Sequence, residues 1–140
     1  MAYNPASKVS TGTPHFPLVV HTGTPYNRFM HAVAETLIFS RRADALLDRD
    51  DRAALVNALA ADPTAGALVP GLGGIRKLRF APAGHGKSGA FRVIYYFAAV
   101  NRPILALLIY GKNEQENITP QQQKALLALI AADKAERRTA

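Results

Sequence analysis

Cysteine is absent from the 140 residues of the sequence. Disulfide bonds and thiolate chemistry are therefore excluded, which suits a reducing cytoplasm. His15, His21 and His31 lack the spacing of metal ligands, so no metal or other cofactor is expected. No apolar run approaches the roughly 20 residues of a membrane span, and the N-terminus has no basic region followed by an apolar stretch. We therefore expect a cytoplasmic protein that makes no contact with a membrane.

Acidic residues are missing from a long central segment. No Asp or Glu lies between Asp62 and Glu114. The rest of the chain holds ten of the 17 basic residues and all ten acidic ones, so the net charge of +7 arises in the acid-free segment. Its basic residues are Arg76, Lys77, Arg79, Lys87, Arg92, Arg102 and Lys112. Positive charge gathered in this way favours a polyanionic partner, either nucleic acid or an acidic protein.

The rest of the composition fits one folded domain, with 49% hydrophobic and 19% charged residues. Residues 1–30 differ, because they carry four prolines and two TGTP repeats. Pro and Gly at this density oppose helices and strands, so we expect a flexible extension in which only the run PLVV is able to pair as an edge strand. Residues 31–140 are then predicted to form a single domain.

Hydrophobic periodicity predicts an α+β fold. A first strand is expected at 34–39, followed by a helical hairpin at 40–61. Ser40 is expected to cap its first helix, and residues 48–51 offer a polar cap for the second. Thr119 and Pro120 mark the start of a C-terminal helix, since proline is favoured at the first helical position.

Three further strands are expected at 75–80, 90–97 and 103–110. The strand at 103–110 is apolar without alternation, which is typical of a strand buried on both faces. The predicted sheet is small and antiparallel, with three or four strands.

Residues 81–88 read APAGHGKS and are similar to a phosphate-binding P-loop, with alanine in place of the first glycine. A P-loop needs a helix after it, so that the helix N-terminus faces the phosphate. Here residues 89–97 have the sequence of a strand, and no apolar strand ends in an Asp that would hold magnesium. We therefore expect a basic hairpin loop, which offers Lys87 and His85 as phosphate contacts.

Strand alternation places the main candidate residues on one face of the sheet. They are Lys77 and Arg79 on the strand at 75–80, and Arg92 and Tyr96 on the strand at 90–97. Cations on such a face hold phosphates, and Tyr96 offers a ring on which a base stacks. The alternative is a solvated face whose charges bind nothing.

Three more candidates lie beside this face. Arg76 is on the same strand as Lys77 but points to the core side near the edge, and we include it as a phosphate-binding candidate. Lys112 and Asn113 follow the last strand and are expected at the rim of the same face.

Three segments of the chain resemble the HigB-like branch of the RelE/ParE toxin superfamily. They read GGIRKLRFA, GKSGAFRVIYYF and LLIYGKNEQENIT, and they occur in the order and spacing of that family. The resemblance covers about residues 34–130 and leaves residues 1–30 outside. It implies a RelE-like fold and a toxin of a type II toxin–antitoxin system.

The resemblance also implies a function and a set of site residues. Relatives are ribosome-dependent endoribonucleases that cleave mRNA without a metal by attack of a ribose 2′-hydroxyl on the adjacent phosphate. A cognate antitoxin, here expected to be a helix-turn-helix DNA-binding protein, inhibits them. Arg92 carries over as the phosphate or transition-state binder. Arg76, Lys77 and Arg79 lie on the strand from which relatives draw catalytic lysines or arginines, and Lys112 matches the basic residue after the last strand.

The chain departs from the family at the acid/base position, because no Tyr or His follows Tyr110. A lysine, His85 or Tyr96 takes this role, or the ribosome supplies the proton transfers. Two rival functions stay open: a ParE-like toxin that binds gyrase, and an inactive RNA-binding relic.

Overall fold

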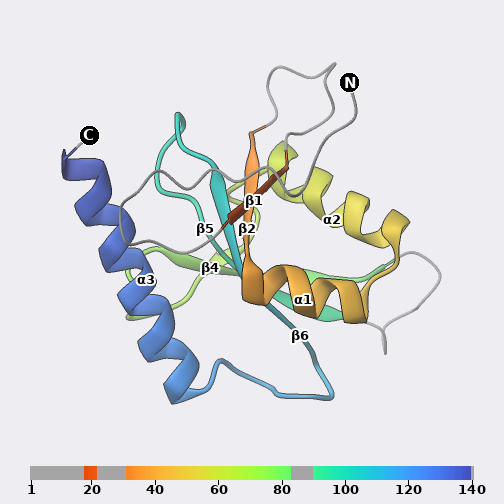
Figure 1. Cartoon of the computed structure of the whole chain (residues 1–140). Helices are drawn as coiled ribbons and strands as arrows, with labels where there is room; N and C mark the ends of the chain where they lie inside the picture. Colours follow the sequence, from red (N-terminus) through yellow and green to blue (C-terminus); the bar gives the residue numbers. More distant parts are fainter. Residues whose placement is uncertain (1–17, 22–30, 83–89, 140) are drawn as a thin grey trace.

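The structure, a computed structural model, describes residues 18–21, 31–82 and 90–139. In this part of the chain six strands form one sheet in the order β1-β2-β6-β5-β4-β3, with three helices packed on it (Figure 1). The strands are β1 (Leu18–His21), β2 (Val33–Thr36), β3 (Ala67–Leu68), β4 (Ile75–Phe80), β5 (Phe91–Tyr96) and β6 (Ile104–Gly111). The helices are α1 (Leu37–Leu46), α2 (Arg49–Ala61) and α3 (Pro120–Thr139).

β6 lies inside the sheet between β2 and β5, and it forms the centre of the core. Its residues from Ile104 to Tyr110 are all buried, which confirms the prediction of a strand enclosed on both faces. β6 is antiparallel to β5 and parallel to β2. β5 pairs with β6 and in turn carries β4 and β3 at the other side of the sheet.

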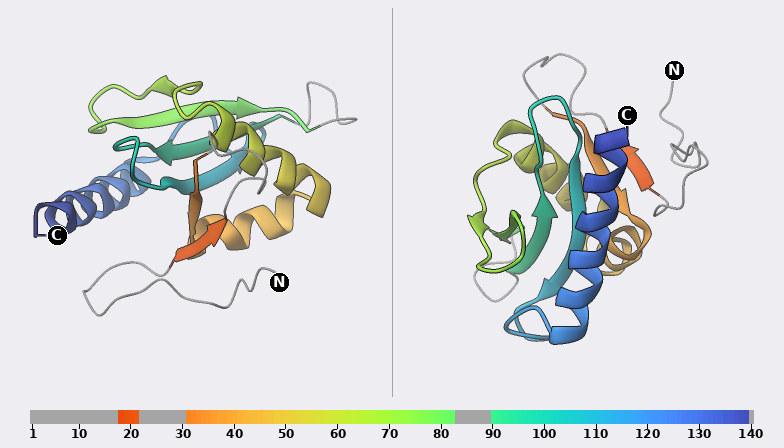
Figure 2. Two further views of the ribbon diagram at one scale, coloured as in Figure 1. Left: turned by 90° about the horizontal axis from the view of Figure 1, so that it is seen from above. Right: turned by 90° about the vertical axis from the view of Figure 1, so that its left-hand side faces the viewer.

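Helices cover both faces of the sheet (Figures 1 and 2). We call the face of the sheet that α1 and α2 cover the hairpin face, and the face that α3 covers the α3 face. On the hairpin face, Phe39 of α1 and Leu55 of α2 form a core with the side chains of Val93 and Tyr95. On the α3 face, Leu126 and Ile130 pack with Ile94 and Tyr96. Successive residues of β5 enter different cores because a strand points its side chains alternately to its two faces.

The boundary between the first strand and the first helix differs from the prediction. β2 ends at Thr36 and α1 begins at Leu37, so the three residues predicted as the end of a strand are helical. Thr36 rather than Ser40 is the N-cap, and its hydroxyl accepts a hydrogen bond from Phe39 N at 3.1 Å and donates one to Leu107 O at 3.1 Å. The tertiary contact with β6 thus outweighs the strand propensity of the apolar residues after Thr36.

The other helix starts agree with the prediction. Asp48 caps α2 by accepting a hydrogen bond from Asp51 N at 2.8 Å. At the start of α3, the Thr119 hydroxyl accepts from Gln122 N at 3.1 Å, and the Gln122 side chain accepts from Thr119 N at 2.9 Å. This reciprocal pair is a capping box, and it sets where α3 begins to cross the sheet.

The α+β class is confirmed, but the sheet is larger than three or four strands and is not purely antiparallel. β1 pairs with β2 as an edge strand, as the PLVV run indicated, and the two-residue β3 pairs with β4. The sequence analysis missed β3, because its two residues lie in a segment rich in Gly, where the apolar pattern is too short to read. The parallel β2–β6 pair is possible because two helices and three strands separate its members in the chain.

Residues 18–21 of the expected extension therefore belong to the sheet. The division into an extension at 1–30 and a domain at 31–140 stays a prediction. No helix within the described residues has the length and apolar character needed to cross a membrane.

Candidate functional site

The register of the central strands brings the predicted cations together on the α3 face. Lys77 pairs with Ile94, and Arg79 pairs with Arg92. Arg92 pairs in turn with Tyr110 of β6. Directly opposed residues of antiparallel strands share a face, so these three cations lie on the side of Ile94 and Tyr110, in agreement with the prediction. We call Lys77, Arg79 and Arg92 the cationic row.

The cationic row has no compensating carboxylate among the described residues. The ion pairs in this part of the chain involve other arginines, namely Arg42, Arg52, Arg102 and Arg137. Arg79 is exposed, while Lys77 and Arg92 are half-buried. Arg79 and Arg92 oppose each other directly, and like charges in that position destabilise a sheet by up to about 1 kcal/mol. The uncompensated positive charge of the row therefore favours the binding of an anion.

Arg92 and Tyr110 also share an unusual hydrogen-bonding state. Nη1 of Arg92 and the phenolic oxygen of Tyr110 are buried and have no hydrogen-bond partner among the described residues. Burial raises the pKa of Tyr110, and the charge of Arg92 offsets only part of that rise. The phenol therefore stays protonated near neutral pH and remains able to donate a hydrogen bond.

Tyr110 lies beside the cationic row, but the sequence did not indicate it as a candidate site residue. It reads as the last apolar residue of a buried strand, and its relation to Arg92 depends on the pairing of β5 with β6. That pairing contains an irregularity between Ile94 and Tyr95. A bulge shifts the register by one residue, and counting residues from the turn cannot reveal it.

Lys112 and Asn113 lie exposed in the turn after β6. Gly111, which precedes them, pairs with Phe91 at the end of β5 where Arg92 lies. The two rim residues are therefore at the same end of the sheet as Arg92, as predicted.

A clamp from α1 holds this turn in place. The Glu114 carboxylate accepts a hydrogen bond from Gly111 N at 3.3 Å and forms an ion pair with Arg42. Arg42 also donates from Nε to Ile109 O at 2.6 Å. The hydrogen bond from Arg42, with a smaller contribution from Gly111, lowers the pKa of Glu114. The turn that carries Lys112 and Asn113 is thus tied to the helical hairpin.

Tyr96 lies on the predicted face of the sheet, but helix α3 covers that part of the face. The residue is only 4% exposed, and its hydroxyl accepts a hydrogen bond from Arg137 of α3 at 3.1 Å. Arg137 donates to Asp133 at 3.0 Å, and Asp133 also binds Arg102 at 3.0 Å. The prediction that Tyr96 stacks an RNA base is wrong, because α3 packs over a surface that the sequence presented as open, while a role of its hydroxyl as acid or base stays a prediction.

Arg76 belongs to the hairpin face rather than to the cationic row. It pairs with Tyr95, and its guanidinium donates to Gly66 O at 2.7 Å and to Thr64 O at 3.3 Å. These contacts hold the loop before β3 against the sheet. We therefore assign Arg76 a structural role and withdraw it from the phosphate-binding candidates.

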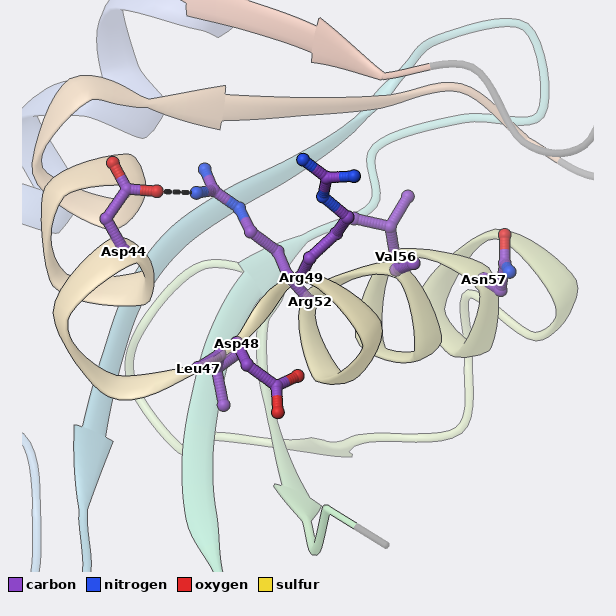
Figure 3. A pocket seen from close by; sticks show the side chains of 8 residues that line it. Asp44, Leu47, Asp48, Arg49, Arg52, Val56 and Asn57 are labelled. Atoms are coloured by element: carbon purple, nitrogen blue, oxygen red, sulfur yellow. Dashed lines mark hydrogen bonds and ion pairs between the residues drawn. The ribbon is translucent and has the colours of Figure 1, made fainter.

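A pocket of about 520 Å³ lies between α1 and α2, away from the cationic row (Figure 3). Its lining includes Arg52, which forms ion pairs with Asp44 and with the buried Glu35. Burial acts to lower the pKa of Arg52, but the bonds to Glu35 and Asp44 outweigh it and raise the pKa. The charges of Arg52 and Asp44 are thus engaged in joining the two helices to each other and to β2.

Two predicted contacts, Lys87 and His85, lie outside the described residues, and their roles stay predictions. Within the described residues, no three His, Cys, Asp or Glu side chains are grouped so that they would hold a metal ion.

A comparison with known families covers most of the chain. Residues 37–138 match the family model described as the RelE toxin of the RelE / RelB toxin-antitoxin system. The matched range contains the cationic row, Tyr110 and the rim residues, and it leaves β1 and β2 outside. The resemblance seen in the sequence is confirmed for the family, while the HigB-like branch stays a prediction.

Proposed function

The chain belongs to the RelE toxin family, and from that premise we propose that it is a ribosome-dependent endoribonuclease that cleaves mRNA and stops translation. Family membership makes it a toxin of a toxin–antitoxin system with a RelB-type antitoxin as its partner. The cleavage reaction, its dependence on the ribosome and the roles of individual residues are our proposal. Because ribosomes are the site of action in this proposal, the activity belongs in the cytoplasm.

The observation that supports an RNA-cleaving site best is the cationic row. Attack of a ribose 2′-hydroxyl on the adjacent phosphate builds up negative charge on the phosphate oxygens. Fixed cations aimed at that charge lower the energy of the transition state, and the loss of one such group typically costs about 10²–10³ in kcat. Lys77, Arg79 and Arg92 meet this requirement, since no described carboxylate neutralises them.

In the proposed reaction the 2′-oxygen forms a bond to phosphorus as the bond to the 5′-oxygen breaks. The 2′-hydroxyl proton passes to a base, and the departing 5′-oxygen takes up a proton. The products are a 2′,3′-cyclic phosphate and a 5′-hydroxyl. Arg92 binds the reacting phosphate, and Lys77 and Arg79 extend the positive field along β4.

At the rim, Lys112 adds a further cation close to the reacting phosphate, while Asn113 contacts the neighbouring nucleotides. Lys87 and His85 are proposed to contribute from the β4–β5 connection. A lysine of the site, His85, Tyr96 or the ribosome supplies the acid and the base.

The antitoxin is proposed to present acidic side chains to the cationic row and the rim. Acidic groups there would neutralise the charge that holds mRNA and would block access at the same time. A helix-turn-helix antitoxin of this kind also binds DNA, which would let it repress the genes of the pair.

The function is tested by expressing the chain without antitoxin and mapping the 5′ ends of cellular mRNA. Growth should stop, and new 5′-hydroxyl ends should appear at codons occupied by ribosomes. The variant Arg92→Ala should restore growth and remove the new ends. The matched control is Arg76→Ala, which removes an arginine on the same sheet that points to the hairpin face, and it should stay toxic.

Each other outcome decides against the proposal. Growth arrest with intact mRNA would sink it, and gyrase-dependent DNA breaks in the arrested cells would establish the ParE-like alternative instead. Normal growth with the folded protein present would indicate an inactive relic.

A further inference from the structure

Two buried polar atoms on neighbouring strands have no hydrogen-bond partner among the described residues. They are Nη1 of Arg92 on β5 and the phenolic oxygen of Tyr110 on β6. Buried polar side-chain atoms are nearly always hydrogen-bonded in folded proteins, and exceptions call for a specific cause such as a ligand. Nε of Arg52 is a further exception, but the other nitrogens of that guanidinium form ion pairs with Glu35 and Asp44. Arg92 and Tyr110 oppose each other directly across the strand pair, so these two exceptions occur at one place.

The chemistry of the guanidinium and the phenol limits which ligand is able to form hydrogen bonds with both. An arginine side chain has only hydrogen-bond donors, and it stays charged at any ordinary pH. The phenol of Tyr110 keeps its proton near neutral pH because burial raises its pKa. Two donors, one of them positively charged, are matched by an anion that carries several acceptor oxygens and no hydrogen of its own. A phosphodiester has this composition.

We propose that Tyr110 is a second phosphate ligand of the site and donates its phenolic hydrogen to a non-bridging oxygen of the phosphodiester that Arg92 binds. This rests on the proposed ribonuclease function, because it names a further residue that touches the same substrate. The phenol keeps its proton throughout, so Tyr110 contributes a hydrogen bond and no proton transfer.

Occupation of this site requires a small movement of the protein. Both unpartnered atoms are shielded from solvent in the free protein, but Arg92 as a whole is only half-buried. A rotation of its long side chain therefore admits a phosphate oxygen between the guanidinium and the phenol. In this arrangement Arg92 binds the anion first, and Tyr110 strengthens its interaction as the charge on the phosphate grows.

A matched pair of tyrosine variants separates a ligand role from a structural one. Tyr95 and Tyr110 are both fully buried, but the hydroxyl of Tyr95 donates to Pro63 O and accepts from Gly66 N, each at 2.8 Å. Tyr110→Phe removes a hydroxyl that has no described partner and should leave the melting temperature unchanged or raise it. Tyr95→Phe removes a hydroxyl with two partners and should lower the melting temperature by roughly 3–8 °C.

The order of the two variants should reverse when their cleavage activities are compared. With programmed ribosomes and the full-length chain, Tyr110→Phe should reduce the rate of mRNA cleavage about 10- to 100-fold, the range expected for the loss of a hydrogen bond to a charged group. Tyr95→Phe should cleave at nearly the wild-type rate at temperatures where it is folded. If Tyr110→Phe cleaves as fast as the wild type, the proposed ligand role is overturned.

A binding measurement distinguishes failure of this inference from failure of the proposed function. The probe is a short 2′-O-methyl RNA, which binds without being cleaved, and the observable is the ¹³Cζ resonance of each tyrosine in the full chain. The resonance that is lost in Tyr110→Phe should shift on addition of the probe, and Arg92→Gln should abolish the shift. A shift in a chain that proves unable to cleave mRNA would support the phosphate site while the ribonuclease proposal fails. Cleavage by the wild type with no movement of the Tyr110 resonance would overturn the phosphate site alone.

Discussion

The two faces of the sheet differ in how the hydroxyl of a buried tyrosine and the guanidinium of a nearby arginine are bonded. On the hairpin face, the hydroxyl of Tyr95 has two hydrogen-bond partners, and Arg52 forms ion pairs with Glu35 and Asp44, although its Nε atom has no hydrogen-bond partner in the described part of the chain. On the α3 face, Tyr110 and Arg92 each bury a polar atom that no described residue satisfies. The residue types are the same in both places, and the two tyrosines lie on neighbouring strands.

The difference indicates which face stabilises the fold and which face binds. A buried polar group with partners adds to stability, whereas one without partners costs about 1–3 kcal/mol. Natural proteins keep such costs where function needs them, and otherwise remove them. We therefore expect the hairpin face to contribute more to stability, and we expect the proposed reaction to take place at the end of the α3 face that holds Arg92 and Tyr110.

The largest expected effect on stability comes from replacing Arg52 or Arg92, in two separate variants, with methionine. Arg52→Met leaves the buried Glu35 carboxylate without its guanidinium, and we expect a loss of about 3 kcal/mol in the free energy of unfolding. Arg92→Met removes a charge that has no described partner and should not destabilise the protein, although it should abolish cleavage. Urea denaturation of both variants measures the contrast. Equal stability losses would mean that the two faces do not differ.

A second contrast uses two glycines. A Cβ added to Gly66 would lie 2.8 Å from the ring and hydroxyl of Tyr95 and 3.0 Å from Lys77 O. Gly66→Ala should therefore cost about 1–3 kcal/mol by overpacking the hairpin face. A Cβ on Gly111, beside the rim, would come no closer than 3.9 Å to Phe91, so Gly111→Ala is the control and should change stability little. Thermal unfolding followed by circular dichroism compares them.

A smaller effect of opposite sign is expected within the cationic row. Arg79→Gln relieves the repulsion from Arg92 across the strand pair, so stability should rise by about 0.2–1 kcal/mol. The same change should slow mRNA cleavage, since one cation of the row is lost. A control is Arg41→Gln, which removes an exposed arginine on α1. A fall in stability on replacing Arg79 would contradict the view that repulsion between Arg79 and Arg92 destabilises the fold.

The smallest effect concerns the clamp between Glu114 and Arg42. Because its folded-state pKa is lowered, Glu114 stabilises the fold fully above its ordinary pKa, and the contribution is lost as the pH falls through the lower folded value. The side chain of Glu114 is 41% exposed, so only a few tenths of a kcal/mol are expected. Between about pH 5 and pH 3 the wild type should lose slightly more stability than Glu114→Gln. The measurement is the free energy of unfolding of both proteins as a function of pH, and an equal change in the two would refute this expectation.

Regular strands were predictable wherever one pattern held for several residues. The strand predicted at 75–80 is β4, and the strand predicted at 90–97 is β5 with one residue fewer at each end. Their alternation of side chains also placed Lys77, Arg79 and Arg92 on a common face, which the register confirms. Such predictions succeed because alternation is a local property of an extended backbone.

Contacts between distant segments were beyond the sequence. The start of α1 depends on a hydrogen bond from Thr36 to Leu107, 71 residues away. The burial of Tyr96 depends on Arg137 of α3, 41 residues away. No local pattern of residues encodes either contact, and the errors in the sequence analysis at Ser40 and Tyr96 arose there.

The sequence by itself determined the acid-free basic segment, its two cationic strands and the membership of a toxin family. Charge and motif are properties of the residues in their chain order, so they could be read without a structure. Only the tertiary structure decided which aromatic residue accompanies Arg92. Helix α3 covers Tyr96 and the pairing of β5 with β6 sets Tyr110 opposite Arg92, because strand register and helix packing are settled by the whole domain.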